Sequence, residues 1–129
     1  MTHARLRGTR GSAAVEFALV LPLLLALALA LLQAGLLAKD QMMVQEAGRA
    51  GARQASVSAD DASVEHAVSE AAAGLDPSAL STTVRRGPGQ GTAVTVRVDY
   101  EDPITLPIVG WLFPSTVRLS AEVTMRQET

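Results

Sequence analysis

The sequence predicts an α+β protein in which a long N-terminal helix precedes a short helix and a small antiparallel β-sheet of about three strands. Three observations predict this fold. Residues 17–38 form an uncharged apolar run that is dominated by Leu, Ala and Val. Residues 39–57 continue a helical pattern without proline. The segments 92–100 and 116–125 alternate apolar and polar side chains, as half-buried strands do.

The apolar run is long enough to cross a membrane, because a spanning helix needs about 20 residues. Basic residues precede it at Arg5, Arg7 and Arg10, and no acidic residue stands before Glu16. Such an excess of basic charge keeps the N-terminus in the cytoplasm, so we expect a single-pass protein of the cytoplasmic membrane with an extracytoplasmic C-terminal part. The run exceeds the roughly 7–15 apolar residues of a cleaved signal peptide. We therefore predict a retained anchor.

Composition excludes several function classes. Acidic residues number 13 against 11 basic ones, and the basic excess lies in the leader, so a nucleic-acid partner is not expected. The absence of cysteine excludes a disulfide framework, a thiol nucleophile and thiolate metal sites. Neither His3 nor His66 has a partner at catalytic or metal-ligand spacing, and the glycine-rich segment 87–91 lies between strands, unlike a phosphate-binding loop. We predict no enzyme and no cofactor.

Glu16 stands at the edge of the apolar run, where an ionisable side chain is a functional candidate by default. A second interpretation places it in the first helical turn with Ser12 as the N-cap, because the helix dipole favours an anion there. Pro22 lies inside the run and predicts either a simple kink or a weak point of the helix.

The motif around Glu16 resembles the processing site of type IV prepilins. Gly11 ends the basic leader, Ser12 follows, and Glu16 stands five positions after the glycine and directly before the apolar helix. The resemblance implies that a prepilin peptidase cuts between Gly11 and Ser12. It also implies that Glu16 neutralises the N-terminal amine of a neighbouring subunit during assembly. An ammonium group at the membrane edge is costly unless it is paired.

Three longer segments narrow this resemblance. Residues 12–22, 46–53 and 121–128 are similar, in this order, to TadE-like proteins, the pseudopilin-like components of tight-adherence (Flp) pilus systems. The resemblance implies a pilin-like fold and a minor pseudopilin that helps to assemble an adhesive Flp-type IV pilus or a related secretion apparatus. Its implied partners are other pilins or pseudopilins, an inner-membrane assembly platform with its ATPase, and membrane lipid. Ser12 differs from the Phe that is common in major pilins.

The expected organisation has four parts: a basic leader (1–11), a transmembrane helix (12–38), an extracytoplasmic helix continuation (39–58) and a small α+β head (59–129). A rival interpretation is a simple single-pass anchor, without prepilin processing, that binds an extracytoplasmic ligand or partner. Another rival is a secreted soluble protein that has lost the residues up to about 38.

Small residues recur in the helix continuation at Ala47, Gly48, Gly51 and Ala52. Each glycine destabilises a helix by about 1 kcal/mol relative to alanine. A run that contains several glycines therefore predicts that this helix packs closely against another element. Small residues at this spacing let another backbone approach closely. The contact is either with another subunit or with the β-domain of the same chain.

Capping signals place the second helix. Asp60 is a plausible N-cap, Gly74 fits a C-cap, and an apolar stripe lies between them. Residues 80–86 and 92–100 then form a hairpin around the glycine-rich turn. Alternation directs one set of side chains of the last two strands inward: Val94, Val96, Val98, Tyr100, Val117, Leu119, Ala121, Val123 and Met125.

Two further features lie near the sheet. Asp99, Glu101 and Asp102 cluster at a strand end, which we interpret as a solvated turn rather than a weak cation site. Residues 107–114 are unusually apolar for a loop. They fill the small core, touch the membrane interface through Trp111, or contact a partner.

Overall fold

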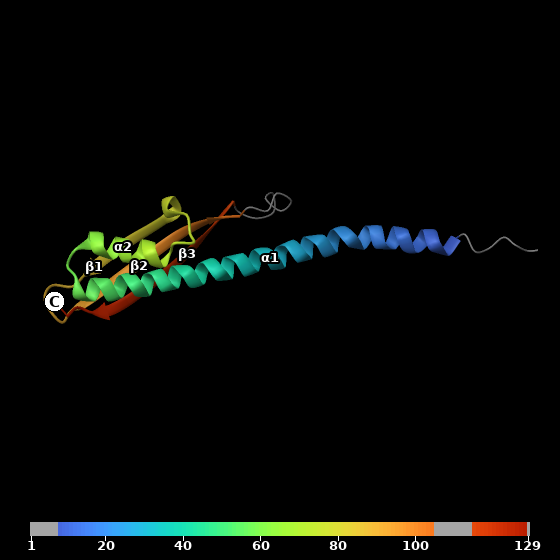
Figure 1. Cartoon of the computed structure of the whole chain (residues 1–129). Coiled ribbons are helices and arrows are strands. Elements are labelled where there is room, and N and C mark those ends of the chain that lie inside the picture. Colours follow the sequence, from blue (N-terminus) through green and yellow to red (C-terminus); the bar gives the residue numbers. More distant parts are fainter. Residues whose placement is uncertain (1–7, 105–114, 129) are drawn as a thin grey trace, which may run out of the picture. The chain divides into compact units, whose positions relative to one another are not determined.

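The computed structural model describes residues 8–104 and 115–128, and side chains from residue 11 onward. The apolar segment 107–114 and the first residues of the basic leader lie outside this range, so their predicted roles stay predictions. Contacts within the chain divide it into two compact units, residues 1–35 and residues 36–129. Figure 1 traces both units and labels the helices and strands.

One helix, α1 (Gly8–Val57), contains the whole apolar run. It is long and apolar enough to cross a membrane by length and composition, with a mean hydropathy of 2.6 in its most apolar window. No part of that window is buried inside the chain, and its leucines are largely exposed. The helix continues through Pro22. It begins before Ser12, so the interpretation of Ser12 as the N-cap is wrong for this chain.

Three antiparallel strands form the sheet: β1 (Leu80–Arg86), β2 (Ala93–Pro103) and β3 (Thr116–Arg126). They follow the order β1-β2-β3, which makes a simple meander. The predicted α+β class and the order of its elements are confirmed. β2 runs past the expected end at residue 100, because its ladder with β3 continues to the pair Pro103 and Thr116.

The turn between β1 and β2 needs glycine at two positions. Gly89 has φ = 101° and Gly91 has φ = 78°, both in the left-handed region that side chains disfavour. The amide of Gly87 donates to the carbonyl oxygen of Ala93 at 3.0 Å and closes the hairpin.

The short helix α2 (Asp61–Ala71) begins as predicted. The Asp60 side chain accepts hydrogen bonds from the backbone amides of Ala62 and Ser63. Its C-cap is Ala72, so the prediction of Gly74 as the cap is wrong. A Cβ at Gly74 would lie 2.5 Å from Cε of Met43 on α1. That methyl group is the flexible end of the Met43 side chain, so a modest shift of Met43 would make room for a Cβ.

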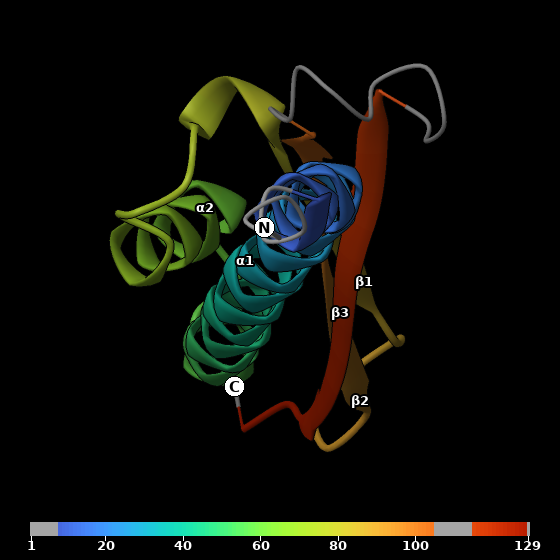
Figure 2. The same ribbon diagram turned by 90° about the vertical axis from the view of Figure 1, so that its right-hand side faces the viewer.

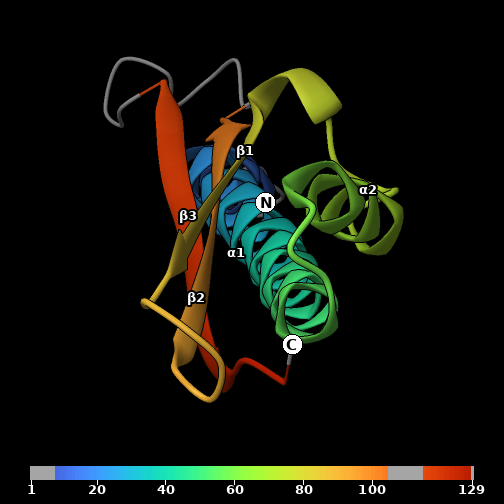
Figure 3. The same cartoon turned by 90° about the vertical axis from the view of Figure 1, so that its left-hand side faces the viewer.

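The second unit has two layers. Figures 2 and 3 show the sheet on one side, with α2 and the C-terminal half of α1 side by side on its inner face. The inward faces of β2 and β3 are those expected from alternation. On β3 only Ala121 is buried, while the other inward side chains are half-buried. The buried apolar core comprises Val44, Ala47, Ala52, Ala55, Val64, Val68, Ala72, Leu75, Val94, Val96, Val98, Tyr100 and Ala121.

The last turn of α1 contains no basic residue, and its exposed carbonyl groups are satisfied from elsewhere in the chain. Arg86 at the end of β1 donates from Nη1 to the carbonyl oxygens of Ala55 (3.0 Å) and Ser58 (2.9 Å). The amide of Glu128 donates to the carbonyl oxygen of Ser56 at 2.8 Å. The helix end is therefore held by the first strand and by the residues that follow the last one.

Candidate functional site

The candidate processing and assembly residues lie together near the start of α1. Ser12 Oγ donates a 3.1 Å hydrogen bond to Oε1 of Glu16, one helical turn further along. Both side chains are exposed. The Glu16 carboxylate is thus within reach of residue 12 on its own helix, and its second oxygen has no hydrogen bond within the described part of the chain.

Within the described residues, no neighbouring atom requires residue 11 to be a glycine. A Cβ built at this position meets nothing within 4 Å. The glycine also lies inside a helix, where alanine would be more favourable by about 1 kcal/mol. Packing among the described residues therefore gives no reason for a glycine at this position.

The small residues of the helix continuation lie against the same chain. Ala47 and Ala52 are fully buried. A Cβ on Gly48 would meet Ala121 and Val123 of β3 at 3.4 Å. A Cβ on Gly51 would come within 2.6 Å of Val68 on α2 and 3.1 Å of Val96 on β2. This face of α1 is therefore covered by the sheet and α2.

The acidic cluster expected at residues 99–102 does not form, because β2 continues through it and sends alternate residues to opposite faces. Asp99 and Glu101 lie on the outer face, whereas Asp102 points inward and is buried. Among the described residues, no group of three or more His, Cys, Asp or Glu side chains is placed to hold a metal ion. The prediction of a solvated turn at these residues is wrong.

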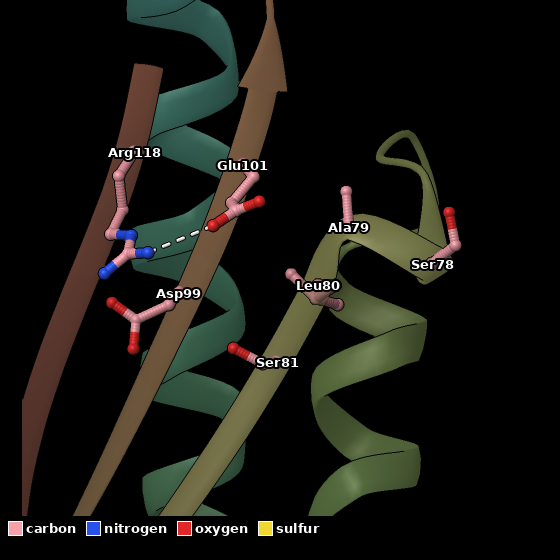
Figure 4. A pocket seen from close by; sticks show the side chains of 7 residues that line it. All are labelled: Ser78, Ala79, Leu80, Ser81, Asp99, Glu101 and Arg118. Carbon is pink, nitrogen blue, oxygen red and sulfur yellow. Dashed lines mark hydrogen bonds and ion pairs between the residues drawn. The ribbon is translucent and has the colours of Figure 1, made fainter. Parts of the chain in front are cut away.

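Asp99 and Glu101 instead form ion pairs on the outer face. Arg97 donates from Nε to Oδ2 of Asp99 at 2.9 Å, and this hydrogen bond holds the pKa of Asp99 below its usual value. Arg118 of β3 donates from Nη2 to Oε1 of Glu101 at 3.0 Å. Figure 4 shows this pair beside a shallow hollow, which is lined by Ser78, Ala79, Leu80, Ser81, Asp99, Glu101 and Arg118.

Sequence reasoning missed the environment of Asp102. Its side chain is buried, with 7 % of the residue exposed, and within the described residues its Oδ2 has no hydrogen-bond partner. Burial raises the pKa of this carboxyl, and the nearby carboxyl of Asp40 on α1 raises it further. A signal was present in the sequence, because residue 102 continues the inward alternation of Val98 and Tyr100.

Comparison with known proteins agrees with the N-terminal motif. No curated protein and no solved structure matches the chain. The family model of TadE-like proteins matches residues 11–53. The matched segment opens at Gly11, includes Glu16 and the apolar run, and ends after the small residues that pack on the sheet. Residues 11–53, about one third of the chain, are therefore similar to TadE-like proteins.

Proposed function

We propose that this chain is a minor, pilin-like pseudopilin that acts in the assembly of a tight-adherence (Flp) type IV pilus or a related secretion apparatus. A prepilin peptidase cuts between Gly11 and Ser12. Glu16 then pairs with the N-terminal amine of a neighbouring pilin or pseudopilin. The chain serves as an assembly component, extracted from the membrane by an inner-membrane platform and its ATPase, and it catalyses no reaction.

One observation carries this proposal: the TadE-like match opens at Gly11, a glycine for which packing among the described residues gives no reason. Recognition by a peptidase supplies the missing reason. The exposed carboxylate of Glu16 lies one turn beyond, where an amine from a second subunit can reach it. The apolar surface of α1 between these residues and the head is exposed within the chain, and lipid or neighbouring helices would cover it.

In the proposed topology, residues 1–11 are the cytoplasmic leader, residues 12–38 cross the cytoplasmic membrane, and residues 39–58 with 59–129 lie outside the cytoplasm. The basic residues before the apolar run support this orientation. The rival is a single-pass anchor without processing, whose head binds an extracytoplasmic ligand or partner.

The first experiment is N-terminal sequencing of the protein extracted from membranes. A start at Ser12 supports the proposal, and an uncut N-terminus supports the rival. Gly11→Val should leave an uncut precursor, because a branched side chain replaces the glycine at the cleavage point. Glu16→Ala should still be cut but should not assemble. Normal pili in a Glu16→Ala strain would refute the assembly role of that carboxylate.

A further inference from the structure

Gln33 is the single polar side chain in the apolar run of residues 17–38. It lies in the middle of α1, and its amide makes no hydrogen bond within the described residues. An amide that enters a membrane without a partner loses its hydrogen bonds to water, which is costly. Among the residues that the structure describes, no group forms a hydrogen bond with this amide to compensate for that loss. A partner outside the chain is therefore required if the run lies in lipid.

We infer that Gln33 joins two copies of this chain through reciprocal hydrogen bonds between their transmembrane helices. This inference rests on the membrane-spanning part of the proposed function. A carboxamide carries an N–H₂ donor and a C=O acceptor, so two glutamine side chains satisfy each other. Two copies insert in the same direction and place Gln33 at the same depth. A twofold axis parallel to the helices then brings each residue opposite its counterpart.

The helix face around Gln33 suits a close approach. Ala26 and Ala30 precede it by seven and three positions, and side chains at these spacings share one face of an α-helix. Both alanines are exposed within the chain. Membrane helices often pack through small residues that lie beside a polar one. The small residues let the two backbones approach until the polar side chains can form hydrogen bonds.

The absence of cysteine from the sequence allows a sharp test by disulfide cross-linking in membranes. Ala26→Cys places a thiol on the Gln33 face. Ala28→Cys is a matched control, since the same substitution two positions along points to the opposite side of the helix. After oxidation with copper phenanthroline, we expect Ala26→Cys to give a disulfide-linked homodimer and Ala28→Cys to remain monomeric.

A second substitution tests whether the dimer depends on the side-chain amide of Gln33. Adding Gln33→Leu to Ala26→Cys should lower the dimer-to-monomer ratio by about 3- to 30-fold, the range that one interhelical hydrogen bond spans in membranes. Gln33→Asn keeps both the donor and the acceptor and should retain most of the cross-link. Equal cross-linking at Ala26 and Ala28, an unchanged dimer with Gln33→Leu, or an adduct with a different protein would each overturn the inference.

The same membrane preparation separates this inference from the proposed function. Fractionation shows whether the chain resides in the membrane, and N-terminal sequencing shows whether it starts at Ser12. A processed membrane protein without the Ala26 cross-link refutes the Gln33 dimer alone. A chain that is absent from the membrane fraction refutes the proposed function on which the inference rests.

Discussion

The guanidinium group of Arg86 at the end of β1 lies 3.0 Å from the carbonyl oxygen of Ala55 in the last turn of α1. The same side chain contacts the carbonyl oxygen of Ser58 and, through Nη2, Oδ1 of Asp61 at 2.7 Å. A single cation thus joins the end of α1, the start of α2 and the first strand. A positive charge at a helix C-terminus also interacts favourably with the helix dipole.

Arg86→Ala should therefore destabilise the head by about 2 kcal/mol, the order expected when partly buried carbonyl groups lose a charged donor. Unfolding of the full chain in detergent, followed by circular dichroism against denaturant, measures this change. Arg85→Ala is the matched control. Its neighbouring guanidinium is exposed and pairs with Glu122 at 3.7 Å, so its loss should cost about 0.5 kcal/mol or less. Equal effects of the two substitutions would contradict the role assigned to Arg86.

Gly51→Ala should destabilise the head by about 1–3 kcal/mol through overpacking. The new Cβ would lie 2.6 Å from Cγ2 of Val68, closer than carbon atoms pack, and the gain in helix propensity offsets only part of this strain. Gly48→Ala serves as the comparison, because its Cβ would meet Ala121 and Val123 at 3.4 Å. Thermal unfolding of both variants should rank Gly51→Ala well below Gly48→Ala. A Gly51→Ala protein as stable as the unmodified chain would contradict the close packing of α1 against α2 at this position.

Asp102→Asn should stabilise the head at neutral pH. The pKa of Asp102 is raised by burial, so the folded chain binds a proton over a pH range where the unfolded carboxyl, with a pKa of about 3.9, has already lost it. Stability contributed by this group is therefore present at low pH and is lost as pH rises through the raised pKa. Asparagine carries no charge and removes that loss.

The measurement is the free energy of unfolding of both proteins between pH 3.5 and pH 8. The advantage of Asp102→Asn should grow with pH and vanish at the acid end of this range. Glu101→Gln is the control from the adjacent position, because Glu101 is exposed and pairs with Arg118 on the other face of the sheet. A pH profile of Asp102→Asn that runs parallel to that of the unmodified protein would refute the link to this carboxyl.

Asp60→Ala should cost about 1 kcal/mol by removing the N-cap of α2. The Asp60 carboxylate accepts from the amides of Ala62 and Ser63, each at 3.2 Å, and no other side chain in the described part of the helix start replaces both bonds. Asp60→Ser should recover most of the loss, because a hydroxyl also accepts from these amides. Urea unfolding of the two variants distinguishes a capping role from a general effect of charge.

Much of the fold could be predicted from local pattern. The apolar run and the proline-free segment after it define α1, and period-two alternation defines β2 and β3, because each element must bury one face. The N-cap at Asp60 was also visible as a local signal. The end of α2 was not visible in this way, because Gly74 has the sequence signal of a helix-terminating glycine although the helix has its C-cap at Ala72.

The candidate sites also differ in whether a local pattern or a long-range contact defines them. Gly11, Ser12 and Glu16 form a short motif that can be recognised in sequence, and the family match begins there. Arg86 could not be assigned, because its partners lie about thirty positions earlier in the sequence and sequence alone does not pair them. Asp102 was assigned to a turn because the strand was expected to end at Tyr100. The alternation already places residue 102 on the inward face, but only the long-range pairing with β3 shows that the strand continues that far.

The meander order has a consequence for how the head matures during export. β3 is the last of the three described strands, and its Ala121 and Val123 cover the position of Gly48 on α1. In the proposed topology α1 enters the membrane first, so the apolar inner face of its C-terminal half stays uncovered until β3 has been translocated. In that topology the inner face of α1 gains its cover from the sheet only when β3 follows, because Ala121 and Val123 lie against the position of Gly48.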